Sequence, residues 1–314
     1  MTIQIFLKLV EIKTKIASFF PFLIGLLFTY YRYGTINLTN TVIFFLAMII
    51  FDMTTTAINN YMDFSKATHE EYRKNSNIIG VEGLNVRSVR NLIFFMLVLA
   101  IGLGLYLVYL TSLIVLFTGI ICFAIGIFYT FGPLPLSRMP LGEIFSGLTM
   151  GIGILFLTVF VNTYHLGYIN LSIANGALTL FLQIPELLII LLAAIPSIFT
   201  IANLMLANNI CDLEEDIKNE RFTIVYYLGK KASINLFMLL YTLSFLSIII
   251  SVAIGIHNPL MLISLGVLPS VIGQVRAFKK KQVKSETFIV AVKNLVLIDG
   301  SLVIGLLLSI AFGR

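Results

Sequence analysis

Residues 91–110 read NLIFFMLVLAIGLGLYLVYL, a stretch without a single charged side chain. An α-helix needs about 20 apolar residues to cross the hydrocarbon core of a bilayer. Because lipid offers no hydrogen-bond partners, the backbone groups of such a stretch must be paired within the segment, as they are in a helix. This stretch therefore decides the fold class, and we expect an all-α protein that lies in a membrane.

Runs of the same kind cover most of the chain. The nine expected spans are residues 6–31, 40–64, 87–110, 112–131, 141–163, 187–211, 232–256, 258–277 and 287–312. We therefore expect a polytopic membrane helical bundle of nine transmembrane helices, forming a single domain over residues 1–314. Residues 170–184 are expected to form a short amphipathic or re-entrant stretch before the sixth helix.

The composition supports the same class. The 314 residues are 59% hydrophobic and only 11% charged, whereas a soluble domain is roughly 25% charged. A soluble fold of this length would have to cover itself with more polar groups than the chain contains. The composition excludes a soluble enzyme and a disordered chain, and the long apolar runs exclude a barrel of short alternating strands.

The distribution of basic residues predicts the orientation of the bundle. If the N-terminus is cytoplasmic, 18 of the 21 lysine and arginine residues fall on the cytoplasmic side. The positive-inside rule then places the C-terminus outside and makes this a multi-pass protein of the cell (cytoplasmic) membrane. Topology accounts for the net charge of +6, and since no basic–aromatic stripe is present, nucleic acid is not an expected partner.

One motif occurs twice. Asn59-Asn60-Tyr61-Met62-Asp63 closes the second expected helix, and Asn208-Asn209-Ile210-Cys211-Asp212 closes the sixth. Both copies read Asn-Asn-x-x-Asp and should face the cytoplasm, as expected of an internal duplication whose copies face each other across one cavity. An Asn and an Asp four residues apart share a helix face, so their oxygens can converge on one ligand.

Acids and bases gather around both copies. Nine of the 15 acidic residues lie in or near the regions 59–82 and 208–221, interleaved with lysines and arginines. Carboxylates and phosphate oxygens together suit Mg2+, and basic side chains neutralise the remaining charge of a diphosphate. The pattern therefore predicts a magnesium–diphosphate site; the alternative is a pair of solvated mixed-charge loops that cap helices.

Three ionisable residues lie deep within expected helices. Asp52 precedes Asn59 by seven residues and Asp63 by eleven, so all three share a helix face. An acid inside a membrane helix is costly and is a candidate for function, although a structural hydrogen bond inside the bundle is the alternative. Asp299 and Lys293 are six residues apart on different faces, and either a structural or a site role fits them.

These residues resemble the UbiA-type membrane prenyltransferases, and most closely the 1,4-dihydroxy-2-naphthoate polyprenyltransferases of menaquinone synthesis. The first motif of that family, Asn-Asp-Tyr-x-Asp-x-x-x-Gly-x-Asp, is similar to residues 59–69. The second, Asn-Asn-x-Arg-Asp-x-x-x-Asp followed by a basic residue and Thr, is similar to residues 208–216 and then Arg221-Phe222-Thr223. The stretch from Tyr129 to Glu143 resembles the junction between helices four and five of the family.

The chain departs from the family pattern at four positions. Asn60 stands where the family has Asp, Ala67 where it has Gly, His69 where it has Asp, and Cys211 where it has Arg. The metal stoichiometry of the family is therefore not carried over. The 4-hydroxybenzoate branch is disfavoured, because residue 67 is Ala and its Arg-Pro element is missing.

The resemblance implies Mg2+-dependent transfer of a polyprenyl group from a polyprenyl diphosphate to 1,4-dihydroxy-2-naphthoate, with decarboxylation to demethylmenaquinone. The implied metal ligands are Asp63, Glu70, Asp212 and Asp216. The implied diphosphate contacts are Asn59, Asn60, Lys66, Arg73, Asn208, Asn209, Lys218, Arg221 and Thr223. The implied catalytic residues are Asp63, Asp212, Asp52, Tyr61, Tyr129 and Glu143. The rings of Tyr61 and Tyr129 would face the allylic cation. Asp52, Glu143 or an acid of the second motif would orient a ring hydroxyl of the acceptor.

Three other functions fit the sequence. The first is prenyl transfer to another aromatic acceptor, such as 4-hydroxybenzoate. The second is a secondary transporter built from repeats, against which the polar cluster at one membrane face counts. The third is a non-catalytic member of the family that binds a lipid or quinone, which Mg2+-dependent turnover would distinguish from the enzyme. The sequence sets neither the prenyl chain length nor the oligomeric state.

Overall fold

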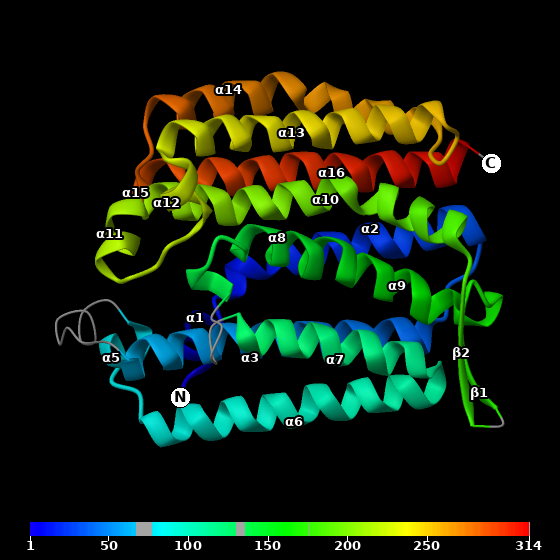
Figure 1. Ribbon diagram of the computed structural model, residues 1–314, viewed down its shortest axis with the longest axis horizontal. Helices are drawn as coiled ribbons and strands as arrows, with labels where there is room; N and C mark the ends of the chain where they lie inside the picture. The colour runs from blue at the N-terminus through cyan, green and yellow to red at the C-terminus, as the bar shows by residue number, and fades with distance from the viewer. Residues whose placement is uncertain (67–76, 130–135, 175, 314) are drawn as a thin grey trace. The chain divides into compact units, whose positions relative to one another are not determined.

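The computed structural model of the chain describes residues 1–66, 77–129, 136–174 and 176–313 (Figure 1). Two predicted site residues, Glu70 and Arg73, lie outside the described residues, and so does the side chain of Lys66. Contacts divide the chain into two compact units, Met1–Ser18 with Leu38–Pro135 and Phe19–Asn37 with Leu136–Arg314. A single domain over residues 1–314 stays a prediction.

Within the described ranges, eight helices are long and apolar enough to cross a bilayer. They are Ile12–Tyr33, Leu38–Ser65, Val86–Leu110, Gly142–Leu166, Ile184–Cys211, Lys230–Ala253, Pro259–Lys280 and Lys284–Phe312. Each coincides with one predicted run, so the helical membrane fold is confirmed. The ninth run, 112–131, contains α7 (Leu113–Phe128), which has 16 residues and spans about 24 Å. The count of nine and the orientation of the bundle stay predictions.

The first unit is built around a long helix that ends at the first motif. Its helices are α1 (Ile3–Leu9), η1 (Ile12–Lys15), α3 (Leu38–Lys66), α5 (Ile78–Val81), α6 (Val86–Leu110) and α7. Helix α3 packs along α6 and also contacts α1 and α5 (Figure 1). Leu9, Ala57, Ile79, Val89 and Ile93 from these four helices form a buried core cluster, which fixes the end of α3 that carries the motif.

Side-chain caps set where helices of this unit begin. The Oδ1 of Asn77 accepts the backbone N–H of Ile79 at 2.9 Å, and that of Asn85 accepts the N–H of Arg87 at 2.9 Å. Such caps satisfy amide groups that have no partner in the first turn of a helix. Helices α5 and α6 therefore start at these asparagines.

The second unit is built around α10 (Ile184–Cys211). Its other elements are α2 (Ile16–Tyr33, from Phe19 on), η2 (Leu136–Arg138), α8 (Gly142–Ser146), η3 (Gly147–Gly153), α9 (Ile154–Thr163), η4 (Tyr164–Leu166), α11 (Leu213–Lys218), α12 (Ile224–Leu228), α13 (Lys230–Ala253), η5 (Pro259–Val267), α14 (Leu268–Lys280), α15 (Lys284–Thr287) and α16 (Ile289–Phe312). Helix α10 contacts α8, η3, α13 and α16, beside which it runs in Figure 1.

Asp299 is one of the contacts between α10 and α16. It is fully buried, and its carboxylate accepts hydrogen bonds from Ser197 at 3.2 Å and from Thr200 at 3.1 Å. An acid buried in a bundle needs such donors. Asp299 therefore has structural partners on α10, in line with the structural alternative for this residue.

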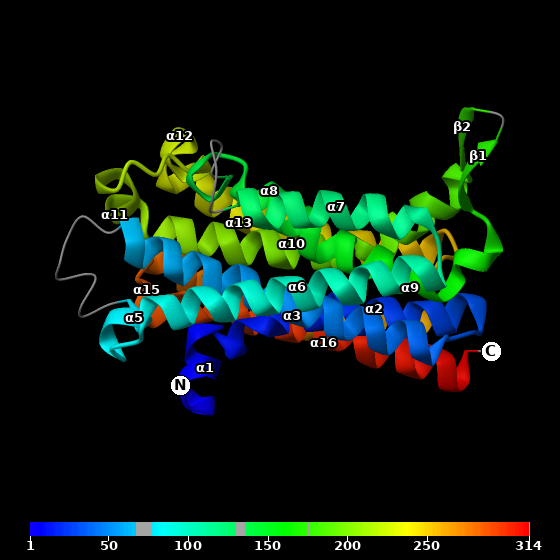
Figure 2. The same cartoon turned by 90° about the horizontal axis from the view of Figure 1, so that it is seen from below.

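The stretch expected to be amphipathic or re-entrant forms a two-stranded antiparallel hairpin. Strands β1 (Ile169–Ala174) and β2 (Ala177–Leu182) pair with Ile169 opposite Leu182 and Ala174 opposite Ala177 (Figure 2). In β1, Asn170 and Ser172 alternate with Ile169, Leu171 and Ile173, which is the period of a strand. In β2, Thr179 is the one polar residue. The hairpin joins η4 to α10.

Two glycines allow η3 to lie directly against α10. A Cβ atom on Gly151 would lie 2.7 Å from the Cα of Ile198, and one on Gly147 would lie 2.8 Å from the carbonyl oxygen of Ile198. Both distances are too short for a side chain, and small residues are what lets membrane helices approach this closely. The contact also fixes α8, which directly precedes η3.

We predict that Gly151→Ala destabilises the protein by about 1–3 kcal/mol, because the added methyl group meets backbone atoms that have no room to move. Thermal unfolding in detergent measures the effect. Gly273→Ala is the matched control, since a Cβ there meets no atom within 4 Å. Equal unfolding temperatures for the two variants would contradict the close approach.

Candidate functional site

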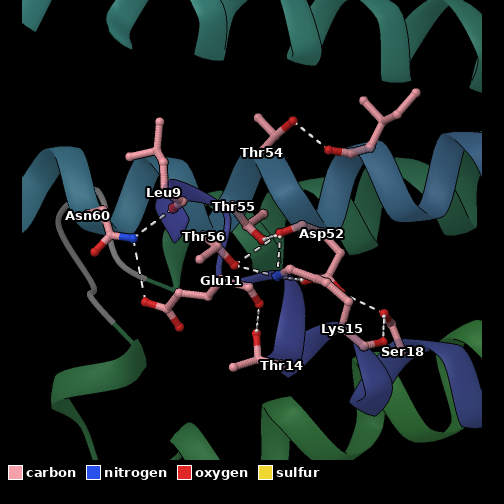
Figure 3. A network of polar contacts seen from close by, with 11 residues as sticks. Leu9, Glu11, Thr14, Lys15, Ser18, Asp52, Thr54, Thr55, Thr56 and Asn60 are labelled. Carbon is pink, nitrogen blue, oxygen red and sulfur yellow. Dashed lines mark hydrogen bonds and ion pairs between the residues drawn. The ribbon is translucent and has the colours of Figure 1, made fainter. Parts of the chain in front are cut away.

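In the first copy of the motif, the second asparagine supports the structure. The side-chain nitrogen of Asn60 donates to the carbonyl oxygen of Leu9 at 2.9 Å (Figure 3). The backbone carbonyl oxygen of Asn60 accepts from the side chain of Asn77 at 2.9 Å. Tyr61, the next residue, packs against the core cluster. The structure thus gives Asn60 and Tyr61 contacts that hold the end of α3.

The other two motif residues lie one turn apart near the end of α3. Asn59 is half-buried and Asp63 is exposed, and their spacing places them on one helix face. Tyr129 directly follows α7 and is half-buried. The ligand and cation-facing roles of these three residues stay predictions.

Asp52 lies in a polar network inside the first unit. The ammonium group of Lys15 donates to the Oδ1 of Asp52 at 2.7 Å and to Thr56 at 2.6 Å, and Ser18 donates to the Oδ2 of Asp52 at 2.6 Å (Figure 3). Lys15 is 5% exposed, and removing one partner of such a pair leaves a buried charge. These contacts are those of a structural ion pair, and a catalytic role for Asp52 stays a prediction.

In the second copy of the motif, the second asparagine again supports the structure. Asn209 is buried, and its amide nitrogen donates to the Oε1 of Glu143 in α8 at 2.7 Å. Asn208, half-buried, and Asp212, which follows α10, share the other helix face. The two copies therefore use their residues alike: the second asparagine contacts a neighbouring element, while the first shares a face with the aspartate.

Asp216 and Arg221 form the end of this second motif. The Oδ1 of Asp216 lies 3.4 Å from the Nε of Arg221, whose backbone N–H donates to the carbonyl oxygen of Asp216 at 2.8 Å. Burial raises the pKa of the Asp216 carboxyl, and the positive charge of Arg221 opposes that rise. A further cation beside Asp216 would favour its ionised form.

Buried oxygens around the second motif have no hydrogen-bond partner among the described residues. They are the Oε2 of Glu143, the Oδ1 of Asn209, the Oδ2 of Asp216 and the Oγ1 of Thr223. Buried acceptors without partners are costly, and each needs an explanation. Carboxylate and amide oxygens only accept hydrogen bonds, so a hard cation suits the oxygens of Glu143, Asn209 and Asp216, whereas the Thr223 hydroxyl can also donate.

Lys284 is the functional candidate that sequence reasoning missed. It begins α15, and its ammonium group donates to the Oδ2 of Asp212. In the sequence analysis Lys284 is one of the basic residues that predict the orientation, and it lies on the cytoplasmic side expected for both motifs.

Lys218, a predicted diphosphate contact, is exposed at the end of α11. Within the described ranges, no three His, Cys, Asp or Glu side chains are arranged to hold a metal.

The sequence is similar to that of a bacterial octaprenyltransferase. It is 28% identical over 297 residues to the 1,4-dihydroxy-2-naphthoate octaprenyltransferase of Bacillus subtilis, and the match covers 93% of this chain and 87% of that protein. The fold is also similar to solved structures. A UbiA homologue from Aeropyrum pernix superposes with a TM-score of 0.68 at 17% identity, over 93% of this chain and 98% of that one.

A UbiA homologue from Archaeoglobus fulgidus, solved with GPP and Mg2+ bound, superposes with a TM-score of 0.67 at 12% identity, over 98% of this chain and 99% of that one. At these identities the structures show a shared fold. The profile of the UbiA prenyltransferase family matches residues 18–295, most of the sequence. The chain therefore belongs to the UbiA prenyltransferase family.

Proposed function

We propose that this chain transfers a polyprenyl group from a polyprenyl diphosphate to 1,4-dihydroxy-2-naphthoate, in a reaction that depends on Mg2+ and releases CO2. The acceptor follows from the similarity to the Bacillus subtilis enzyme over 93% of the chain. Mg2+ and an allylic diphosphate are bound together in the related Archaeoglobus fulgidus structure. The excess of basic residues on one side supports placing both motifs at the cytoplasmic face.

The observation that carries the proposal is the set of buried acceptor oxygens at the second motif. Asn209, Asp216 and Glu143 each hold one oxygen without a hydrogen-bond partner in the described part of the chain, and Asp212 lies four residues before Asp216. Mg2+ takes oxygen ligands from carboxylates and substrate phosphates, so these residues fit it. When bound, Mg2+ supplies a Lewis acid that makes the diphosphate a better leaving group.

Each residue then has a defined task. Asp212 and Asp216 hold the cation, and the shared pattern gives Asn59 and Asp63 of the first motif the corresponding role. Arg221, which also donates to the carbonyl oxygen of Ser137 at 3.4 Å, offsets the charge that grows on the leaving diphosphate. Glu143, held by Asn209, is placed to orient a hydroxyl group of the acceptor.

The proposed reaction breaks the bond between the allylic carbon and the diphosphate oxygen. The electron-rich ring carbon that carries the carboxylate forms the new carbon–carbon bond, and the carboxylate leaves as CO2. No electrons are exchanged with another reagent, so the immediate product is the hydroquinone form of demethylmenaquinone. An apolar bundle suits this chemistry because excluding water protects the allylic cation from hydrolysis.

We predict that Asp212→Asn and Asp216→Asn each lower prenyl transfer about 100-fold or more, the scale expected when a charge-stabilising group is removed from an active site. The assay measures product formed by membranes that contain the variant. Chelation of Mg2+ should abolish turnover by the natural sequence, and added Mg2+ should restore it.

Glu214→Gln is the matched control for this experiment. Glu214 lies between the two aspartates on α11 but is exposed, so its loss removes the same charge without removing a proposed ligand. Turnover that is unchanged in Asp212→Asn and Asp216→Asn, or equally reduced in Glu214→Gln, would rule out the proposed metal site.

The acceptor is tested by competition. We expect 1,4-dihydroxy-2-naphthoate to be prenylated and 4-hydroxybenzoate to be a poor acceptor, because the chain lacks the Arg-Pro element of the 4-hydroxybenzoate branch. Mass spectrometry of the products from an equal mixture of both acceptors gives the ratio directly. Predominant prenylation of 4-hydroxybenzoate would overturn the proposed acceptor and leave the prenyl transfer intact.

A further inference from the structure

The ion pair between Asp212 and Lys284 joins the end of the second motif to the start of α15. The Asp212 side chain is 10% exposed and the Lys284 side chain is 56% exposed. Asp212 is therefore buried, whereas Lys284 contacts it from the surface. The charge of Lys284 also acts on Asp216, where it favours the ionised carboxylate. Lys284 therefore faces both aspartates that we assign to the metal.

The two cationic side chains at these aspartates differ in how firmly they are held. Arg221 contacts Asp216 at 3.4 Å and donates to the carbonyl oxygen of Ser137 at 3.4 Å. Lys284 carries a compact charge on a flexible four-carbon stem and is more than half exposed. Lys284 can thus leave Asp212 without breaking a contact that holds a helix.

We propose that Lys284 occupies the cation position at Asp212 in the metal-free enzyme and moves to the diphosphate when the metal and the diphosphate bind. This inference rests on the proposed function. Metal alone must displace the ammonium group and binds weakly, whereas a diphosphate offers that group a new partner. Lys284 therefore couples the binding of the metal to the binding of the diphosphate.

Titration of the purified full-length chain with Mn2+, followed by the electron paramagnetic resonance signal of free Mn2+, tests this coupling. In Lys284→Gln we expect Mn2+ alone to bind about threefold to tenfold more tightly, the scale of a partly exposed ion pair. The increase in Mn2+ affinity caused by inorganic pyrophosphate should shrink by a similar factor. Lys284→Arg, which keeps the charge, should behave as the natural sequence does.

Lys281→Gln is the matched control, because Lys281 lies three residues before Lys284 and pairs with the exposed Glu286 at 2.6 Å. It should leave both affinities unchanged. Equal or weaker Mn2+ binding by Lys284→Gln would overturn the role of Lys284. The same titration of Asp212→Asn separates this failure from that of the proposed function. If Asp212→Asn binds Mn2+ as the natural sequence does, Asp212 is not a ligand and both proposals fail.

The hairpin supports a second, independent inference. Its register pairs Leu171 with Leu180 and Ile169 with Leu182, while Ser172 pairs with Thr179 and Asn170 with Phe181 on the opposite face. Residues directly opposite each other in a sheet share a face, so one face is wholly aliphatic and the other carries the polar groups together with Phe181. Leu178, Leu180 and Leu182 are 63%, 53% and 41% exposed.

The position of the hairpin indicates what covers this face. It starts three residues after Leu166 and ends two residues before Ile184, at the ends of two membrane-spanning segments. Its strands run across the direction of α9 and α10 in both views (Figures 1 and 2), as they would along a membrane plane. Residues 166–185 include no charged side chain, so nothing in the hairpin requires full exposure to water.

We propose that the aliphatic face of the hairpin lies on the lipid bilayer, as an interfacial anchor at the membrane face opposite the second motif. Helix α10 has 28 residues and separates the two by about 42 Å. When aliphatic surface moves from water to the boundary of the acyl chains, binding to the bilayer is stabilised in proportion to the area removed from water. An isolated hairpin is marginal in water, and the bilayer gives this one a surface to pack on.

The chain has no tryptophan, so a single introduced indole reports its own surroundings. In phosphatidylcholine vesicles, Leu180→Trp should emit at short wavelength and be quenched strongly by lipids brominated on their acyl chains. Thr179→Trp, its neighbour on the polar face, should emit at longer wavelength and be quenched weakly. Equal quenching of Leu180→Trp and Thr179→Trp would overturn the proposed anchor. Short-wavelength emission from Leu180→Trp without quenching would also overturn it, because contact with a second copy of the chain would give that result.

Discussion

The close approach of η3 to α10 is the constraint on which the candidate site depends. Gly147 and Gly151 leave no room for a side chain above Ile198, and this brings α8 against the end of α10. Only then does Glu143, one turn before Gly147, reach the amide of Asn209 at 2.7 Å. That bond fixes Asn209 and Glu143, and among the described residues the Oδ1 of Asn209 and the Oε2 of Glu143 have no hydrogen-bond partner. Both atoms are among the acceptors on which the proposed site rests.

In both copies of the motif, the second asparagine makes a structural contact, and the first asparagine and the aspartate share another helix face. Asn60 contacts the end of α1 and Asn209 contacts α8, so each second asparagine fixes a helix end. We propose that the aspartate four residues after the first asparagine binds the ligand. Donors and charges fixed before the substrate arrives need no reorganisation during the reaction, and the structural bonds of Asn60 and Asn209 provide that fixation.

The sequence predicts the fold well because membrane helices have a local signal: a run of about 20 apolar residues suffices, and eight of the nine predicted runs are helices of that length. Hairpin 169–182 was less predictable, since residues 177–182 contain one polar side chain, and a short apolar run does not distinguish a strand from a helix. Asp52 and Lys15 are 37 residues apart, and no local pattern connects them. Lys284 was missed for the same reason, because its contact with Asp212 depends on how α15 packs.

The central claim is that the second motif serves decarboxylating prenyl transfer. The purified chain is supplied with a polyprenyl diphosphate, Mg2+ and 1,4-dihydroxy-2-naphthoate that is labelled in its carboxyl group. The labelled CO2 and the diphosphate that are released are then measured together. We expect equal amounts of CO2 and diphosphate, and neither product without the prenyl donor. Diphosphate release without CO2, or no release of either, would contradict it.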